Sequence, residues 1–483
     1  LSETSLLAGA SGQSTGYTID QSIRFNKADS AYMSRTVGSG GNTKTWSYSV
    51  WFKIGLLGSS RGGQNFLWSC HQSDSNRLQL GFDNGSLGNA GDFLSIYNNT
   101  GSGSTIFRTT RVFRDLSAWY HLVLVADTSN AVAIERFRVY LNGQRVTDFS
   151  TFNAPSLNAD LGWNQNGNTY YIGDYFSTHN GTYSFDGYMA EINHVDGYAY
   201  GPEYFGEFKE NTDIWIPKEY TGSYGTKGFH IDGRDSGDLG DDESGNGNDF
   251  TLSDIAAHDQ VLDSPTNNWC VMNYNNTHTS ITLSNGNLQS TASAFTGSGA
   301  TILLPSTGKW YAEMRYNNAS TGEYPMMGIY NTIKNLSTTG LNPGNTSGDL
   351  DIGFGADGRR YEDTTNTGSW GNAVGDGKIG ALAIDMDNKK IWFGHNNSGS
   401  FVWQASGDPS AGNNEANTKA FADNVVFGNS HYSGSIVCWN FGQEGTFGGT
   451  ETAQGNTDAN GLGNFYYSVP TGYLALCTTN IGS

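Results

Sequence analysis

The sequence contains few basic residues and few charges of any kind. Lys and Arg number 26 against 46 Asp and Glu, which gives a formal net charge of −20. A nucleic-acid-binding surface needs clustered Lys and Arg to neutralise phosphates, so this composition argues against one. Charged residues make up 15% of the 483 residues, which is below the charge density of a coiled coil or an acidic tail.

Long apolar runs and paired cysteines are also missing. No stretch of 18 or more apolar residues occurs, and no basic segment followed by an apolar run opens the chain, so we expect neither a membrane span nor a signal peptide. The 4 cysteines, Cys70, Cys270, Cys438 and Cys477, are widely spaced and form no metal-binding pattern. We therefore expect buried free thiols rather than a disulfide scaffold or a zinc site.

The composition is rich in turn formers and aromatic residues. The chain has 65 Gly and 48 Asn, nearly a quarter of its length, and 13% aromatic residues. Gly and Asn favour turns, whereas the aromatic content is enough to build a buried core. Helical periodicity is almost absent, and a short helix over residues 202–208 is the best candidate. These features predict an all-β protein.

Segments of alternating apolar and polar residues predict strands in two separate blocks. In the first block, residues 46–54 place Trp46, Tyr48, Val50, Phe52 and Ile54 on one face, with Ser47, Ser49 and Lys53 pointing away. Further strands are expected at 119–126, 170–172 and 188–195. Residues 136–146 form an expected hairpin, because their Asn142-Gly143 pair is typical of a type I′ turn.

The middle of the chain has fewer predicted strands and a more polar composition. Two isolated strands are expected at 214–217 and 228–231, followed by the polar run DGRDSGDLGDDESGNGND over residues 232–249. This run is either a plain surface turn or a calcium loop, in which Asp238, Asp241 and Asp242 would supply oxygen ligands. No EF-hand spacing is present to separate the two alternatives. We expect no other cofactor.

Strands resume in the last third of the chain. They are expected at 309–315, 351–355, 425–427, 435–441 and 473–477, with a hairpin from 379 to 393. The pattern predicts two antiparallel β-sandwiches, at residues 1–210 and 291–483, joined by a loop-rich linker over 211–290.

Motifs in both blocks are similar to those of known families. The ordered pieces at 22–25, 46–54, 119–122, 139–143, 171–173 and 185–192 resemble the laminin-G-like branch of the concanavalin A-like lectin/glucanase superfamily. The pieces at 308–313, 327–329, 375–385, 390–393 and 437–442 resemble the SPRY domain, although the usual Asn-Gly after the Trp-Phe strand is replaced by residues 395–399. Both resemblances imply concanavalin A-like jelly-roll sandwiches.

The order of the two blocks resembles structural proteins of tailed phages, particularly marine ones. This resemblance implies a subunit of a tail fibre, head fibre or capsid decoration on the virion surface. Its partners would be other virion proteins, further copies of itself, such as a trimer, and a host-surface glycan bound by many weak contacts. We expect neither nucleic-acid binding nor membrane insertion. A purely structural subunit without a ligand is the alternative, and a secreted lectin or a polysaccharide-degrading enzyme is less favoured.

The chain carries no recognisable catalytic motif. The β-glucanases of the superfamily use Glu-x-Asp-x-x-Glu, whose carboxylates flank the scissile bond. The nearest sequence here places Glu191 and Asn193 on one strand face, and an amide does not replace a carboxylate. HExxH, a nucleophile elbow and a P-loop are all absent. We therefore expect no enzymatic activity.

Two tryptophans in polar loops are candidates for glycan binding. Trp163 lies in the stretch GWNQNGN and Trp370 in NTGSWGN. Sugar recognition commonly combines an aromatic face with amide and carboxylate groups, which both loops provide. In the alternative interpretation, each indole folds back to cover a sandwich edge.

Overall fold

The computed structural model contains two compact units, one ending at Asn267 and the other beginning at Asn268. The structure describes residues 16–57, 65–83, 92–101, 103–176, 179–292, 294–317, 325–332, 334–337, 342–344, 348, 350–368, 370–397, 399–432 and 434–482. Both units consist of largely antiparallel β-sheets, so the predicted all-β class is confirmed. Within the described residues no helix has the length and hydropathy needed to cross a membrane.

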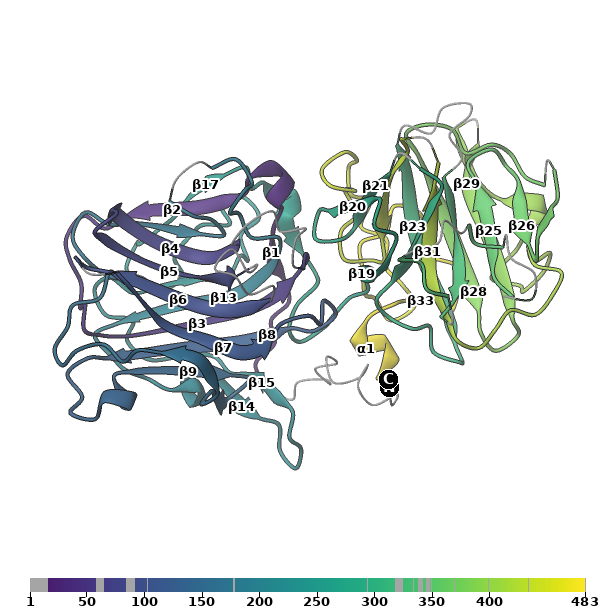
Figure 1. Ribbon diagram of the computed structural model, residues 1–483. Coiled ribbons are helices and arrows are strands. Elements are labelled where there is room, and N and C mark those ends of the chain that lie inside the picture. The colour runs from purple at the N-terminus through teal and green to yellow at the C-terminus, as the bar shows by residue number, and fades with distance from the viewer. Residues whose placement is uncertain are drawn as a thin grey trace. The chain divides into compact units, whose positions relative to one another are not determined.

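The first unit contains two facing sheets, which we call the β3 sheet and the β6 sheet. The β3 sheet has the order β10 (Gln144–Arg145), β9 (Phe137–Leu141), β8 (Tyr120–Asp127), β3 (Thr45–Ile54), β13 (Gly187–Asp196), β1 (Ser22–Phe25) and β18 (Gln260–Val261), and β16 (Phe229–Ile231) also pairs with β13. The β6 sheet has the order β11 (Phe149–Phe152), β7 (Ser104–Val112), β6 (Phe93–Asn99), β5 (Asn76–Asp83), β4 (Asn65–Ser73), β12 (Thr169–Ile172), β2 (Tyr32–Thr36) and β17 (Thr251–Ser253). Strands β4 to β7 lie side by side in Figure 1.

The core of the first unit lies between these sheets. The predicted alternation of β3 turns Tyr48 and Phe52 inward, where they meet rings of the β6 sheet. The ring centroids of Tyr48 and Trp68 are 5.4 Å apart, and those of Phe52 and Phe82 are 5.8 Å apart. The interior of this sandwich is therefore dominated by aromatic packing.

The opposite face of the β3 sheet is covered by residues that follow β13. Phe205 and Tyr220 pack on Val123, Val125 and Val195 of the sheet. The covering residues include a 3₁₀ turn at Pro202–Tyr204 and a hairpin of β14 (Gly206–Phe208) and β15 (Trp215–Pro217). The helix expected at 202–208 is thus wrong, because the backbone returns to a strand after one 3₁₀ turn.

Polar residues on this face of the β3 sheet are buried by the covering segment. Ser47, Ser49 and Lys53, which alternation turns away from the core, are all buried. Ser49 hydrogen-bonds Nε2 of His121 at 2.8 Å, and the indole NH of Trp215 donates to Nδ1 of the same imidazole at 2.8 Å. The cover thus supplies polar partners to a polar sheet face.

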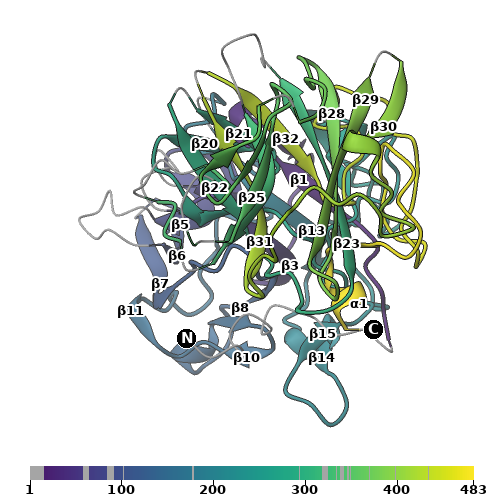
Figure 2. The ribbon, with the colours of Figure 1, turned by 90° about the vertical axis from the view of Figure 1, so that its right-hand side faces the viewer.

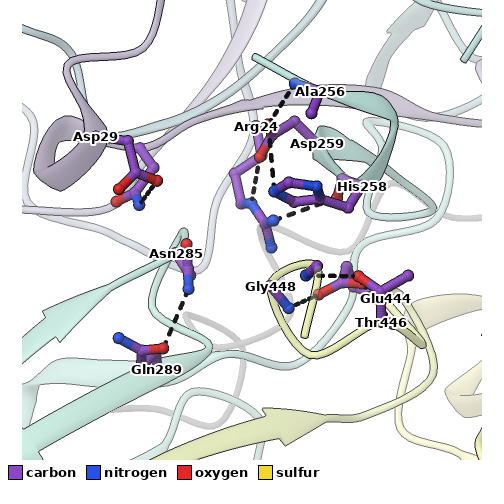
Figure 3. A network of polar contacts seen from close by, with 12 residues as sticks. Arg24, Asp29, Ala256, His258, Asp259, Asn285, Gln289, Glu444, Thr446 and Gly448 are labelled. Atoms are coloured by element: carbon purple, nitrogen blue, oxygen red, sulfur yellow. Dashed lines mark hydrogen bonds and ion pairs between the residues drawn. The ribbon is translucent and has the colours of Figure 1, made fainter. Parts of the chain in front are cut away.

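Two buried ion pairs also hold the covering segment on the β3 sheet. Nζ of Lys53 lies 2.7 Å from Oδ2 of Asp263, whose Oδ1 accepts a hydrogen bond from the indole of Trp119 at 3.1 Å. Nε of Arg24 lies 3.1 Å from Oδ1 of Asp259, and the guanidinium also donates to the carbonyl of His258 (Figure 3). Because buried charges need partners, these contacts tie residues 258–263 to the sheet.

The second unit also contains two sheets. One has the order β19 (Met272–Thr277), β22 (Thr296–Ala300), β31 (Val425–His431), β24 (Met326–Asn331), β25 (Ile352–Gly355), β26 (Arg360–Glu362) and β27 (Thr365–Asn366). The other has the order β20 (Ile281–Ser284), β21 (Gln289–Ala292), β32 (Ile436–Asn440), β23 (Lys309–Asn317), β28 (Lys378–Asp385), β29 (Lys390–Asn397) and β30 (Ser400–Trp403), with β33 (Leu474–Ala475) parallel to β23. Figure 2 shows β28 to β30 side by side. The four-residue helix α1 (Thr478–Ile481) follows β33.

The segment expected as a linker over 211–290 is divided between the two units. Strands β15 to β18 belong to the first unit, whereas β19 to β21 belong to the second. The short strand β18 pairs with β1, so that Ser22 lies opposite Val261. Partners this far apart along the chain explain why local sequence patterns do not reveal the boundary.

All four cysteines are buried thiols, as predicted. Burial raises the pKa of the Cys70 thiol well above its ordinary value. Thiols in such surroundings are poor nucleophiles, so these cysteines act as small apolar core residues.

Candidate ligand-binding cleft

The structure places Trp163 in the core of the first unit. Its side chain is fully buried, with ring centroids 4.4 Å from Trp68 and 4.3 Å from Tyr170. The indole NH donates to the imidazole of His194, whose pKa burial lowers to about 3. Neither face of the indole is accessible to a sugar, so the glycan-binding interpretation of Trp163 is wrong and the folded-back alternative holds.

Trp370 is half-buried in the second unit. Its ring packs edge-on against Phe354 at 5.7 Å and Phe393 at 6.5 Å. The guanidinium of Arg360 lies 5.8 Å from the ring centroid, over one face. This packing resembles the cover of a sandwich edge, and a glycan contact at Trp370 stays a prediction.

The three aspartates of the expected calcium loop play separate roles. Both carboxylate oxygens of buried Asp242 accept hydrogen bonds from neighbouring NH or OH groups, including the backbone NH of His230 at 2.9 Å and that of Asn248 at 2.8 Å. Asp238 is exposed and accepts from the NH of Gly240, and Asp241 is also exposed. Among the described residues no group of three or more His, Cys, Asp or Glu is arranged to hold a metal ion. The loop is therefore organised by turn hydrogen bonds, as the plain-turn alternative expects, and calcium binding by these aspartates stays a prediction.

Glu191, the residue nearest to a glucanase carboxylate in the sequence, lies at an irregularity in β13. Its φ is 50°, and the pairing with β3 shifts register between Ala190 and Asn193. Its carboxylate accepts a hydrogen bond from Tyr17 at 2.8 Å and contacts Nε2 of His230 at 2.8 Å. Burial alone would lower the pKa of His230, but the bond to Glu191 and the charge of its carboxylate raise it. Both carboxylate oxygens thus hold neighbouring segments together.

A cleft of about 360 Å³ opens at the edge of the first unit, and we call it the edge cleft. It is bordered by the last strands of both sheets, β9 and β10 on one side and β11 on the other. Its lining consists of Ile134, Glu135, Phe137, Arg138, Val139, Arg145, Val146, Thr147, Phe149 and Phe152. The volume lies within the range of about 300–1,000 Å³ that is typical of small-ligand sites.

Local backbone features shape the edge cleft. Asn142 and Gly143 have φ of 47° and 76°, which confirms the predicted tight turn between β9 and β10. In β11 the register shifts between Phe149 and Thr151, which marks a bulge. Because a bulge inserts one residue into the alternation, Phe149 and Phe152 come to share a face, and their rings stack at 5.2 Å.

Charged groups lie beside this aromatic wall. Nη1 of Arg145 lies 2.8 and 3.0 Å from the two carboxylate oxygens of Glu135, and both side chains are about one third exposed. An ion pair of this exposure contributes only about 0–1 kcal/mol, so a ligand can compete for both groups. The cleft thus combines apolar rings with accessible hydrogen-bonding groups, as an amphipathic ligand requires.

The edge cleft could not be predicted from the sequence. The sequence predicts a hairpin over residues 136–146 and no strand over residues 149–152. The sequence Phe149-Ser-Thr-Phe152 carries a signal, since its aromatic spacing of three does not fit a regular strand. This irregular spacing indicates the bulge. It does not predict the cleft, because the cleft also requires β9 and β11 to face each other, which depends on the tertiary structure.

Comparison with known families finds one match, which lies within the first unit. Residues 26–197 match a laminin-G-type family model described as the concanavalin A-like lectin/glucanases superfamily. The resemblance of the first block is thereby confirmed, and the edge cleft lies within the matched residues. No curated protein sequence matches the chain.

Solved structures resemble the chain at low sequence identity. Domains LG4–5 of the mouse laminin α1 chain are 9% identical, with coverage of 88% of this chain and 90% of that chain and a TM-score of 0.28. The SPRY domain of human HERC1 is 15% identical, with coverage of 35% and 96% and a TM-score of 0.25. A Bacteroides ovatus protein, provisionally described as carbohydrate-binding, is 16% identical with a TM-score of 0.34. The match covers 50% of this chain and 61% of that protein, less than two thirds of its length.

Proposed function

We propose that the chain is a carbohydrate-binding surface protein, of the kind that forms fibres or decorations on tailed-phage virions. The edge cleft would bind a glycan of the host surface without covalent chemistry. The observation that carries the proposal is the combination of the stacked Phe149 and Phe152 with the partly exposed pair Glu135–Arg145 in one cleft.

The chemistry of the cleft fits a saccharide. Sugar rings present an apolar CH face, which packs on aromatic rings, and hydroxyl groups, which hydrogen-bond to guanidinium and carboxylate groups. The lectin-like fold of residues 26–197 supports the same ligand class. The net charge of −20 keeps a densely displayed surface protein soluble.

The virion location and the assembly state rest on the order of the two sequence resemblances. Partners would be other virion proteins and further copies of this chain, as in a trimeric fibre. Each cleft is small, so a single site would bind weakly, and many copies on one particle would supply avidity. The structural alternative, a subunit without a ligand, needs no cleft of this chemistry.

Binding to an array of bacterial surface polysaccharides tests the proposed ligand class. The full chain should bind at least one glycan, and Phe149→Ala should weaken that binding at least tenfold, because the aromatic wall loses one ring. Phe295→Ala, which removes an exposed ring of the second unit, is the matched control and should bind like the parent. No binding by the parent chain, or equal binding by Phe149→Ala, would overturn the glycan-binding proposal.

The location has a separate test. Mass spectrometry and antibody labelling of purified phage particles should detect the chain on the particle surface. A chain absent from particles would contradict the virion assignment, even where glycan binding holds. A chain present on particles that binds no glycan would favour the structural alternative.

A further inference from the structure

A row of three tyrosines lies on the cover of the β3 sheet, and we call it the tyrosine ridge. It consists of Tyr198, Tyr200 and Tyr204. The rings of Tyr198 and Tyr200 are nearly parallel, with centroids 5.2 Å apart and an interplanar angle of 8°. The rings of Tyr200 and Tyr204 stack at 4.2 Å and 26°. Tyr200 is therefore the middle ring, and the two end rings are each 42% exposed.

The tyrosine ridge has a fixed base. Tyr220 contacts the ring of Tyr200 at 6.1 Å and stacks on Phe205 at 5.1 Å. Phe205 and Tyr220 in turn belong to the cluster of buried residues on the β3 sheet. A surface whose rings are already ordered loses little conformational entropy when a ligand binds. The end rings are thus exposed although the ridge itself is held in place by buried residues.

One residue, Arg138, contacts both the edge cleft and the backbone of the tyrosine ridge. This residue lines the edge cleft. Its Nη2 also donates to the carbonyl of Ala199 at 3.4 Å, and Ala199 stands between Tyr198 and Tyr200 in the chain. The guanidinium therefore connects the two surfaces around the β9 edge of the first unit.

We propose that the ligand is an extended saccharide chain that starts in the edge cleft, passes Arg138 and continues over the tyrosine ridge. This inference rests on the proposed glycan binding and adds to it the length of the ligand. The cleft, at about 360 Å³, holds a short saccharide, whereas the exposed rings of Tyr198 and Tyr204 offer stacking faces for further sugar units. The two surfaces then bind as linked subsites.

Chain-length dependence tests the inference. The probes are size-graded fragments from partial hydrolysis of the polysaccharide that gives the strongest array signal with the full chain. Calorimetric titration should show Kd falling at least tenfold from the shortest fragments to fragments of eight or more sugars. An affinity that does not change with fragment length would overturn the extended ligand.

Variants locate the gain in affinity. The double variant Tyr198→Ala/Tyr204→Ala should lose about the whole gain for long fragments and keep the parent affinity for the shortest ones. The variant Tyr198→Phe/Tyr204→Phe keeps both rings and should keep most of the gain. Phe208→Ala removes a comparably exposed ring of the β14–β15 hairpin outside the ridge and serves as the control.

The outcomes separate this inference from the proposed function. Loss of all binding in Phe149→Ala, with the double tyrosine variant like the parent at every length, would overturn the ridge subsite and keep the cleft. Loss in the tyrosine variant alone would overturn the cleft as the starting point. A parent chain that binds no array polysaccharide would overturn both.

Discussion

The two faces of the β3 sheet are both buried, but they are buried by different chemistry. The face toward the β6 sheet packs aromatic rings such as Tyr48 and Trp163. The opposite face holds Ser47 and Lys53, which find a hydrogen-bond and an ion-pair partner in the covering segment, and Ser49, which hydrogen-bonds His121 of the neighbouring strand β8. One face thus gains stability from apolar area, whereas the other depends on matched polar partners.

This difference teaches how to interpret polar residues in an alternating strand. Polar positions usually indicate a solvent-exposed face. Here they mark a face that a later part of the chain covers, and the partners sit at residues such as Trp215 and Asp263. Polar alternation is therefore compatible with burial, provided that every buried group finds a partner.

The largest expected effect tests the aromatic face. Trp163→Ala should lower the free energy of unfolding by about 3–5 kcal/mol, because a large buried ring is replaced by a cavity. Urea denaturation followed by near-UV circular dichroism measures the change. Trp370→Ala removes a half-buried indole and should cost less; equal costs would break the proposed contrast between a core ring and an edge ring.

A smaller effect tests the polar face. Asp263→Asn should cost about 2–3 kcal/mol, since the buried ammonium of Lys53 loses its charged partner. Adding Lys53→Met should recover part of this loss, because the unpaired charge is then gone. A double-mutant cycle by urea denaturation measures the coupling, and strictly additive costs would show that the pair does not hold the cover.

The smallest expected effect is a pH dependence of the unfolding free energy that arises from the buried carboxyl group of Asp186. Asp186 accepts a hydrogen bond from the backbone NH of Lys27, and burial outweighs this bond and nearby positive charges, so that its pKa is raised to about 7. The protonated form is favoured in the folded state, so the stability it contributes is present at low pH and lost as pH rises through 7. Between pH 6 and pH 8 the loss should be about 1 kcal/mol.

Asp186→Asn is the test of this pH dependence. The variant carries no titrating group at this position, so its unfolding free energy should fall less between pH 6 and pH 8 than that of the parent. Glu210→Gln alters an exposed carboxylate and should leave the parent slope unchanged. A parent slope in Asp186→Asn would assign the pH dependence to other groups.

Much of the strand pattern could be predicted from local sequence. The alternation of residues 46–54 corresponds to β3, and the Asn142-Gly143 pair to the turn after β9. Strands β4 to β7 are not among the predicted strands, although Leu78, Leu80 and Phe82 of β5 alternate along the sequence. Strands β15 and β16 of the covering segment correspond to the strands predicted at 214–217 and 228–231. The pairing of β16 with β13 and of β18 with β1 could not be predicted, because these partners lie far away in the sequence.

The candidate site was less accessible to sequence analysis. Tryptophan in a polar loop is ambiguous, and Trp163 lies in the core because its loop folds between the two sheets, where Trp68 and Tyr170 receive it. The edge cleft depends on the facing of β9 and β11, which belong to different sheets. Local sequence patterns predict which residues alternate along a strand, but they do not predict which edge strands of two sheets face each other.

The way each unit closes has a consequence for synthesis on the ribosome. The first unit needs residues 258–263 to satisfy Arg24 and Lys53, and the second pairs Trp269 with Cys477. In each unit, residues near its C-terminal end thus make contacts that complete its fold. The first unit can complete its fold once about Asn267 has left the exit tunnel, whereas the second can do so only after about Cys477 has left it. Vectorial synthesis would therefore separate the two folding events in time and limit strand exchange between sandwiches of similar design.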